Sequence, residues 1–177
     1  MSLQYAKESI IMVALKDVEE NQRRMQEINL QSSSAWKSKS LALTTLLADA
    51  LHNNTKLTSL NLTDCMINDA SITKLAETLT HNASLFHLNL SNNKLGRPGL
   101  LALSKALPTN TGLISLELTG IRIDGAVSAA FLDAFGTNVT LCKLIWSPEI
   151  SGYNLKFTEL LCVPPEIVGV GCVAHHL

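Results

Sequence analysis

The strongest constraint on the fold is an internal repeat with a period of 28 residues. Three copies without gaps begin at Leu57, Leu85 and Leu113, and a fourth begins at Leu141. An earlier, looser copy begins at Met25 and takes 32 residues to reach Leu57. Repeats of this length are typical of solenoids, in which one unit cannot bury its own apolar side and stacking buries all of them.

Each copy carries two hydrophobic periods. It opens L-x-x-L-x-L, so its second and third leucines alternate with a polar residue, as in a strand with one buried face. In its second half, apolar residues recur one helical turn apart, which predicts an amphipathic helix. The inward strand positions are Leu60, Leu88 and Leu116, and Leu62, Leu90 and Leu118. The helix columns are Leu47, Leu75, Leu103 and Phe131, and Leu51, Leu79, Leu107 and Phe135.

Polar residues and glycine recur where each predicted helix should begin and end. Asparagine tolerates the left-handed backbone conformation, so one placed just before each strand should close the preceding helix in that conformation. These asparagines are Asn54, Asn82, Asn110 and Asn138. The residues placed to begin helices are Asn68, Gly96 and Asp124.

The pattern L-x-x-L-x-L-x-x-N/C-x-L/I, followed by a helix ending L-x-x-N, resembles the ribonuclease-inhibitor-type leucine-rich repeats. The resemblance covers roughly Met25 to Leu161. Cys65 and Asn93 occupy the N/C position, and Ile121 departs from it. The resemblance implies an α/β fold: a right-handed leucine-rich-repeat solenoid with a parallel sheet of about five strands on its concave face and helices on its convex face.

Three parts of the chain follow from this pattern. Residues 1–24 should form an N-terminal helical cap, residues 25–150 the leucine-rich repeats, and residues 151–177 an irregular C-terminal cap or tail. Strands are expected near residues 25–30, 57–62, 85–90, 113–118 and 141–146.

Three segments interrupt the regular pattern. QSSSAWKSKS is too long for the repeat and predicts a protruding loop, with Trp36 either tucked against the cap or exposed to a partner. Phe157 to Leu161 could form a degraded helix. Residues 166–173 are strand-like and would either close the sheet edge or form a loose tail.

No constellation of residues has the spacing of a catalytic or phosphate-binding motif, so we expect no enzyme activity and no cofactor. Zinc could use Cys162 and Cys172 with His175 or His176, but that spacing matches no familiar ligand pair, and we expect no metal site. Arg23, Arg24 or Arg122 could act as the finger of a GTPase activator, although an ordinary surface arginine is the simpler interpretation.

Charge and composition exclude further classes of partner. The net charge of −1 and the aromatic content of 5% argue against nucleic acid. The apolar run from Ile10 to Leu15 is far shorter than the ~20 residues that span a bilayer, and the N-terminus lacks a secretory signal. We therefore expect a cytoplasmic monomer that binds another protein.

The predicted binding surface is formed by outward strand positions, most of them short and neutral, with Phe86 and Ile114 at the starts of two strands. Such a surface suits hydrogen bonding more than electrostatic steering. Its asparagines could instead stack their amides and stabilise the sheet. The candidate residues are Glu27, Asn29, Asn61, Phe86, His87, Asn89, Ile114, Glu117, Lys143 and Ile145.

A closer resemblance lies at the N-terminal side. V-E-E-N-Q-R-R-M-Q-E-I-N-L, from Val18 to Leu30, followed by a helix ending A-D-A-L-H-N-N-T, from Ala48 to Thr55, is similar to the start of the tropomodulin C-terminal domain. The resemblance implies capping of actin filaments at the pointed end, actin or tropomyosin as a partner, and a cytoskeletal location. The later repeats are more regular than that family's, and a proline-containing tail replaces its long terminal helix.

Three functions therefore stay open. A protein–protein interaction module that uses the concave sheet is the first hypothesis, because the fold most often serves that role. Tropomodulin-like capping of actin pointed ends is the alternative, and a GTPase-activating protein of the leucine-rich-repeat type is the third.

Overall fold

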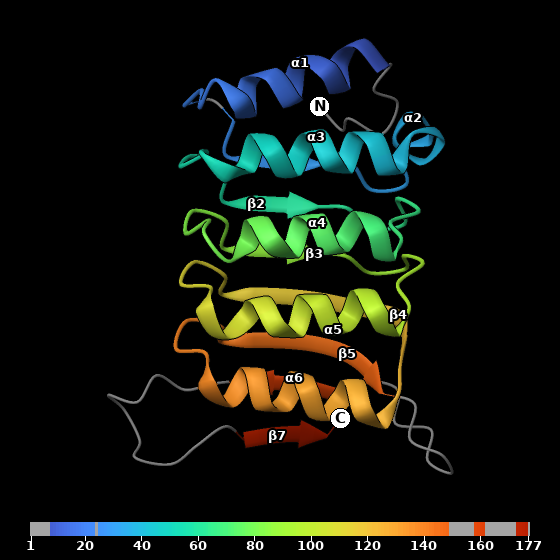
Figure 1. Cartoon of the computed structure of the whole chain (residues 1–177), viewed down its shortest axis with the longest axis vertical. Helices are drawn as coiled ribbons and strands as arrows, with labels where there is room; N and C mark the ends of the chain where they lie inside the picture. Colours follow the sequence, from blue (N-terminus) through green and yellow to red (C-terminus); the bar gives the residue numbers. More distant parts are fainter. Residues whose placement is uncertain (1–7, 24, 149–157, 162–172, 177) are drawn as a thin grey trace.

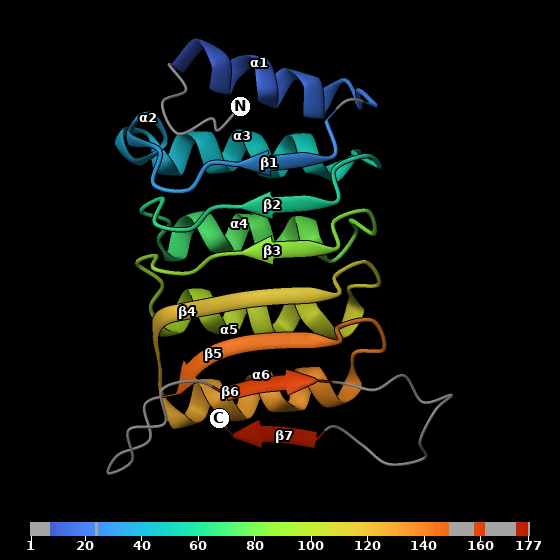
Figure 2. The same ribbon diagram turned by 180° about the vertical axis from the view of Figure 1, so that it is seen from behind.

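The repeats fold into a single stack with strands on one face and helices on the other. A computed structural model describes residues 8–23, 25–148, 158–161 and 173–176. Figures 1 and 2 show the stack from its helical and its sheet face. The α/β solenoid expected from the repeat is confirmed, with five parallel strands in chain order. These strands are β1 (Glu27–Asn29), β2 (Ser59–Asn61), β3 (His87–Asn89), β4 (Ser115–Ile123) and β5 (Lys143–Pro148).

The helices follow the strands in the order that the repeat predicts. Asn68 and Asp124 cap two of them, since their side-chain oxygens accept from Ser71 N at 3.0 Å and from Val127 N at 2.9 Å. Gly96 precedes a third. The helices are α1 (Glu8–Glu19), α2 (Ser34–Ser38), α3 (Ser40–His52), α4 (Asp69–Leu79), α5 (Arg97–Ala106), the 3-10 turn η1 (Leu107–Thr109) and α6 (Gly125–Thr137).

The hydrophobic core lies between the two layers. The strand register places the inward leucines of successive repeats side by side, with Leu60 beside Leu88 and Leu88 beside Leu116. The helix column that contains Leu47 and Phe131 is fully buried against them. Each repeat therefore buries its apolar side only because its neighbours do the same.

The asparagines before the strands do not adopt the predicted left-handed conformation. Asn110 and Asn138 are extended, with φ of −71° and −74°, so that interpretation was wrong. The side chain of Asn82 instead donates to the carbonyl oxygens of Leu51 at 2.8 Å and Asn54 at 3.0 Å, both in the preceding repeat. Its oxygen accepts from the N–H of Leu85 at 2.9 Å. The four asparagines thus form a buried ladder that ties each repeat to the one before it.

The segment expected to protrude as a loop forms the short helix α2. Ser33 caps it, because its hydroxyl accepts from the N–H of Trp36 at 3.3 Å. Trp36 is completely buried, so of the two positions considered it takes the one tucked against the cap. The large apolar ring explains why the extra residues fold inward.

Strand β4 is longer than the predicted strand and continues to Ile123. In the preceding repeat, the Asn93 side chain bonds the main chain of Cys65, Ile67, Leu62 and Leu90 and so holds the turn after the strand. Ile121 stands at the equivalent position and cannot form such bonds. The chain there runs on beside β5 after an irregularity that includes Gly120, whose φ is +73°.

The end of the stack beyond β5 changes direction. Strand β6 (Thr158–Leu161) pairs antiparallel with β5, and β7 (Val173–His176) pairs antiparallel with β6. The degraded helix expected from Phe157 to Leu161 is therefore wrong for its described part, which is a strand. Of the expected closing segment, residues 166–172 lie outside the described residues, as do Cys162 and Cys172.

Candidate protein-binding surface

The open face of the sheet displays two rows of side chains that cross five strands. Glu27, Ser59, His87, Ser115 and Lys143 are register partners from β1 to β5. The second row is Asn29, Asn61, Asn89, Glu117 and Ile145. We call these rows the open sheet face. It lies on the side of the sheet away from the core (Figure 2).

A shallow hollow of about 230 Å³ lies at the centre of the open sheet face. Asn61, His87, Asn89 and Glu117 line it, so the structure brings four of the predicted residues together. The amide of Asn89 donates to the Glu117 carboxylate at 2.6 Å. This charge-assisted bond holds the Glu117 carboxylate in the lining of the hollow, and the His87 side chain, which also lines it, is exposed.

The asparagines of the second row also shape the backbone. The side-chain oxygens of Asn29, Asn61 and Asn89 accept from the N–H group two residues further on, at 3.1, 3.0 and 2.9 Å. Each asparagine therefore stabilises the point where its own strand ends. Asn89 also uses its side-chain nitrogen, which donates to Glu117.

Phe86 lies at the rim of the sheet rather than on its open face. It stands two residues before the inward Leu88 and lines a separate hollow of about 580 Å³ with His52 and His81. The two imidazole rings meet edge to face with 5.9 Å between their centroids. Ile114 is its neighbour, since the N–H of Ile114 donates to the Phe86 carbonyl at 2.8 Å. The structure thus separates these two apolar residues from the other candidates.

The remaining candidates lie on the outer strands of the parallel sheet. Glu27 and Asn29 belong to β1, the first strand of the sheet. Lys143 and Ile145 belong to β5, which is not a free edge, because they pair with Leu161 and Glu159 of β6. The open sheet face therefore has one end at β1 and continues past β5.

Two titratable groups beside the first repeats have shifted pKa values. The Lys37 ammonium, 2.6 Å away, and the Ser32 hydroxyl donate to Asp64 and lower the pKa of its carboxyl group. Burial raises the pKa of the Cys65 thiol to about 12. A thiol held protonated and away from solvent is a poor nucleophile, so Cys65 serves as a small core residue.

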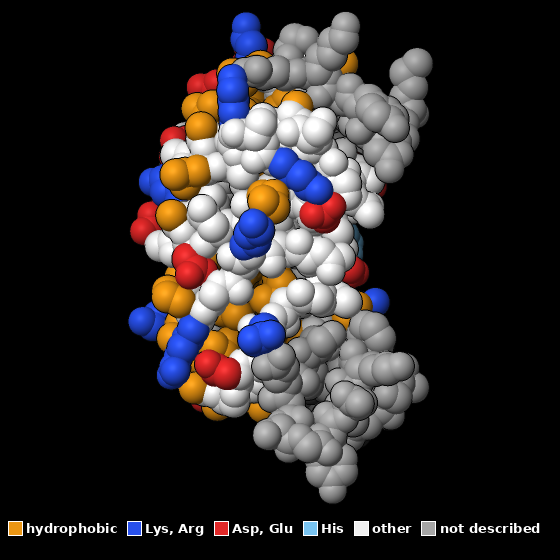
Figure 3. All heavy atoms as spheres, turned by 90° about the vertical axis from the view of Figure 1, so that its right-hand side faces the viewer, with side chains coloured by type: hydrophobic (Ala, Val, Ile, Leu, Met, Phe, Trp, Pro, Cys, Tyr) orange, Lys and Arg blue, Asp and Glu red, His pale blue; other side chains and the backbone are white. Residues whose placement is uncertain are grey.

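The described residues offer little material for other kinds of site. Within them, no group of three metal-ligating side chains gathers in one place. No described helix is long and apolar enough to cross a membrane. Of the arginines considered for a GTPase activator, Arg24 is not described, while Arg23 precedes β1 and Arg122 lies on β4. Figure 3 shows cationic and anionic side chains spread over one flank of the stack, some of them side by side.

Sequence reasoning missed one surface, formed by apolar side chains on the helical face. Met12 and Val13 of α1 and Leu46 of α3 are exposed. The sequence could have predicted this exposure. Ile11, Leu15 and Val18 share the buried face of the helix, whereas Met12 and Val13 lie outside that face.

The fold defines this chain as a leucine-rich-repeat protein. Residues 9–145 match the model of the tropomodulin/leiomodin family, described as the TMOD/LMOD leucine-rich domain, and the chain belongs to this family.

Solved structures agree with this assignment. The structure titled Leiomodin-1 Actin-Binding Site 2 (ABS2) is 25% identical, with a TM-score of 0.72, and the match covers 81% of this chain and 82% of that one. A tropomodulin C-terminal domain from Caenorhabditis elegans is 18% identical, with a TM-score of 0.68 over 76% of this chain and 80% of that one, and it shows the fold alone. No curated protein matches the chain.

Proposed function

We propose that this chain is a non-catalytic actin-binding domain. The family supports a protein-binding role, and the observation that carries the finer proposal is the likeness to the leiomodin-1 structure, whose title names it an actin-binding site. That likeness spans most of both chains. Association with the cytoskeleton follows from such a role.

The open sheet face is the proposed contact surface. Its hollow combines an exposed imidazole, His87, with the fixed carboxylate of Glu117 and the amide of Asn61. These groups favour a partner surface that offers hydrogen-bond donors and at least one cation, which would pair with Glu117. Lys143 and Ile145 would extend the contact toward β5.

Within this function, we infer that the chain acts at the pointed end of the actin filament, as the tropomodulin resemblance implies. Tropomyosin would then be a second partner. Actin binding and pointed-end capping can be tested separately. Binding requires only that the domain contact actin, whereas capping also requires that the bound domain block the addition of the next actin subunit.

The test has two arms. In the first, labelled monomeric actin is titrated with the chain, and saturable binding at micromolar concentrations is the expected result. In the second, elongation is followed from filaments whose barbed ends are blocked, and slowed growth is expected. The absence of binding to monomeric and to filamentous actin would overturn the proposed function. Binding without slowed growth would overturn only the pointed-end inference.

A further inference from the structure

The end of the stack at α1 carries a concentration of exposed apolar side chains. Ten large hydrophobic residues are exposed in the described part of the chain, and five of them lie on α1 and α3. Met12, Val13 and Leu46 are exposed by 45%, 56% and 46%. Clustered apolar side chains of this kind mark interaction surfaces, whereas single ones are ordinary.

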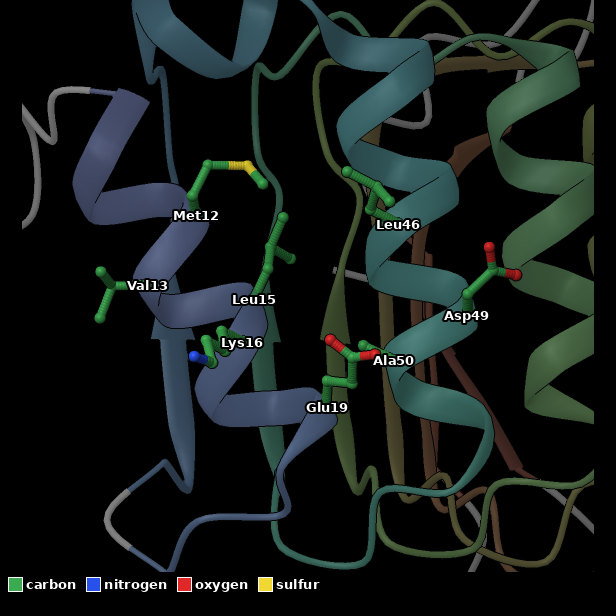
Figure 4. A pocket seen from close by; sticks show the side chains of 8 residues that line it. All are labelled: Met12, Val13, Leu15, Lys16, Glu19, Leu46, Asp49 and Ala50. Carbon is green, nitrogen blue, oxygen red and sulfur yellow. The ribbon is translucent and has the colours of Figure 1, made fainter.

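These side chains border a groove of about 610 Å³ between the two helices. Met12, Leu15 and Glu19 line it from α1, and Leu46, Asp49 and Ala50 line it from α3 (Figure 4). The lining residues recur at three- and four-residue intervals on both helices, so the groove runs along the helix axes. A third helix is the shape that fits such a groove.

The neighbouring groove between α3 and α4 differs in chemistry. Its lining is polar, and the Lys74 ammonium lies 3.8 Å from both the Asp49 and the Glu77 carboxylates, bridging the two helices. The apolar groove beside α1 is therefore not a general property of this helical face.

The same surface also carries a ridge that could enter such a groove. Ile10 and Val13 are one helical turn apart on α1 and are exposed. Val13 also lines the groove, and Figure 4 shows its side chain pointing away from α3 while Met12 lies on the side of α3. Opposite charges accompany them, since Lys16, Glu19 and Asp49 all line the groove, and the largely exposed Lys16 ammonium lies 3.6 Å from the Glu20 carboxylate. A contact between identical copies about a two-fold axis requires a surface that is complementary to itself, and this one holds ridge, groove and both charges.

We propose that the α1–α3 groove binds a second copy of this chain, with α1 of each copy packed against the groove of the other. The carboxylates of Glu19 and Asp49 make an anionic lipid surface a poorer occupant. The open sheet face lies on the other layer of the stack and stays accessible in such a dimer (Figures 1 and 2).

The size of the surface sets the expected affinity. A helix of 12 residues such as α1 is about 18 Å long. A contact built on it is smaller than the ~800 Å² per partner of a standard interface, so we expect a dissociation constant of about 10–100 µM.

Sedimentation velocity of the full chain tests the proposal over about 5–500 µM. The wild-type chain should pass from monomer to dimer in this range. Met12→Glu and Leu46→Glu should each weaken association at least tenfold, because they place a charge in the groove. Both positions are on the surface, so the thermal midpoint should change by less than about 3 °C.

Leu132→Glu is the matched control. Leu132 is exposed by 50% on α6, away from the groove, and the variant adds the same charge. It should dimerise like the wild type. A wild-type chain that stays monomeric throughout overturns the proposal, as does a dimer that Met12→Glu leaves intact or that Leu132→Glu weakens equally. The measurement contains no actin, so its failure would leave the proposed function standing.

Discussion

The side-chain nitrogen of Asn110 donates a hydrogen bond of 3.0 Å to the main-chain carbonyl of Asn82, the equivalent residue one repeat earlier. Asn82 makes the same bond to Asn54 and accepts from Ser84 and Leu85. Asn82→Ala would leave the N–H groups of Ser84 and Leu85 without their acceptor and remove one donor from the Asn54 carbonyl, which should cost about 3 kcal/mol in free energy of unfolding. Urea denaturation measures this, with Asn53→Ala as control, since Asn53 directly precedes the ladder residue Asn54 and is exposed. Equal losses in both variants would refute the ladder.

The inward and outward assignment of β3 can be tested at neighbouring residues. Leu88 is buried between the equivalent leucines of β2 and β4, whereas the His87 side chain is exposed. Leu88→Ala should leave a cavity and cost about 2–5 kcal/mol. His87→Ala should change stability by less than about 0.5 kcal/mol. Thermal or urea unfolding decides the matter, and a large loss at His87 would contradict the assigned register.

Gly120 should not tolerate a side chain. Its φ is +73°, and a Cβ there would clash with the side-chain oxygen of Asn92. Gly120→Ala should therefore cost at least about 1–3 kcal/mol. Gly125→Ala is the control, because a Cβ at Gly125 meets no atom within 4 Å. A Gly120 variant as stable as the control would show that β4 does not need this turn.

The Cys65 thiol should be inert in the folded chain. Its pKa is raised by burial from 9.0 to about 12, so it remains protonated when an ordinary thiol begins to ionise. Alkylation near pH 8, followed by mass spectrometry of the peptide that contains Cys65, should show modification only after unfolding in urea. Rapid modification of the folded chain would contradict the burial.

The same shift makes stability depend on pH. Because the folded pKa of Cys65 lies above the unfolded value, its contribution is complete below pH 9.0 and is lost as the pH rises toward about 12. Near pH 10.5 the loss relative to neutral pH should be about 2 kcal/mol, and Cys65→Ala should lack that component.

The proposed contact with actin makes a prediction at Glu117. Glu117→Lys reverses the charge in the central hollow and should weaken actin binding about tenfold or more. Glu117→Gln keeps an oxygen that can accept from Asn89 but removes the charge, so it separates the charge from the fold. If Glu117→Lys leaves the affinity for actin unchanged, the open sheet face is not the surface that contacts actin.

The repeat made the architecture predictable, because in stacked repeats each leucine of the motif is buried beside the equivalent leucine of the next repeat. Leu88 and Leu116 are buried side by side, as their spacing requires. The role of Asn82 was harder to predict, because asparagine before a strand suits both a left-handed cap and a buried donor. Only the position of the preceding repeat, which supplies the carbonyl groups, decides between them.

Other features depended on contacts that a linear pattern does not contain. Phe86 was grouped with His87, but neighbouring residues of a strand point to opposite faces, and Phe86 lines the rim hollow with His52 and His81. The reversal at β6 followed no periodic signal, because a four-residue strand and one helical turn look alike in sequence.

The buried asparagine ladder has a mechanical consequence for a domain proposed to bind the cytoskeleton. Tension applied along the stacking axis loads the joints between repeats in series, so the chain would yield first at its weakest joint. The repeats are joined by strand pairing as well as by the ladder. Among the described residues no strand precedes α1, and one ladder bond, from Asn54 to the carbonyl of Val18, joins α1 to the first repeat. Pulling should therefore detach α1 before it separates the repeats, and the sheet would keep its shape after that first rupture.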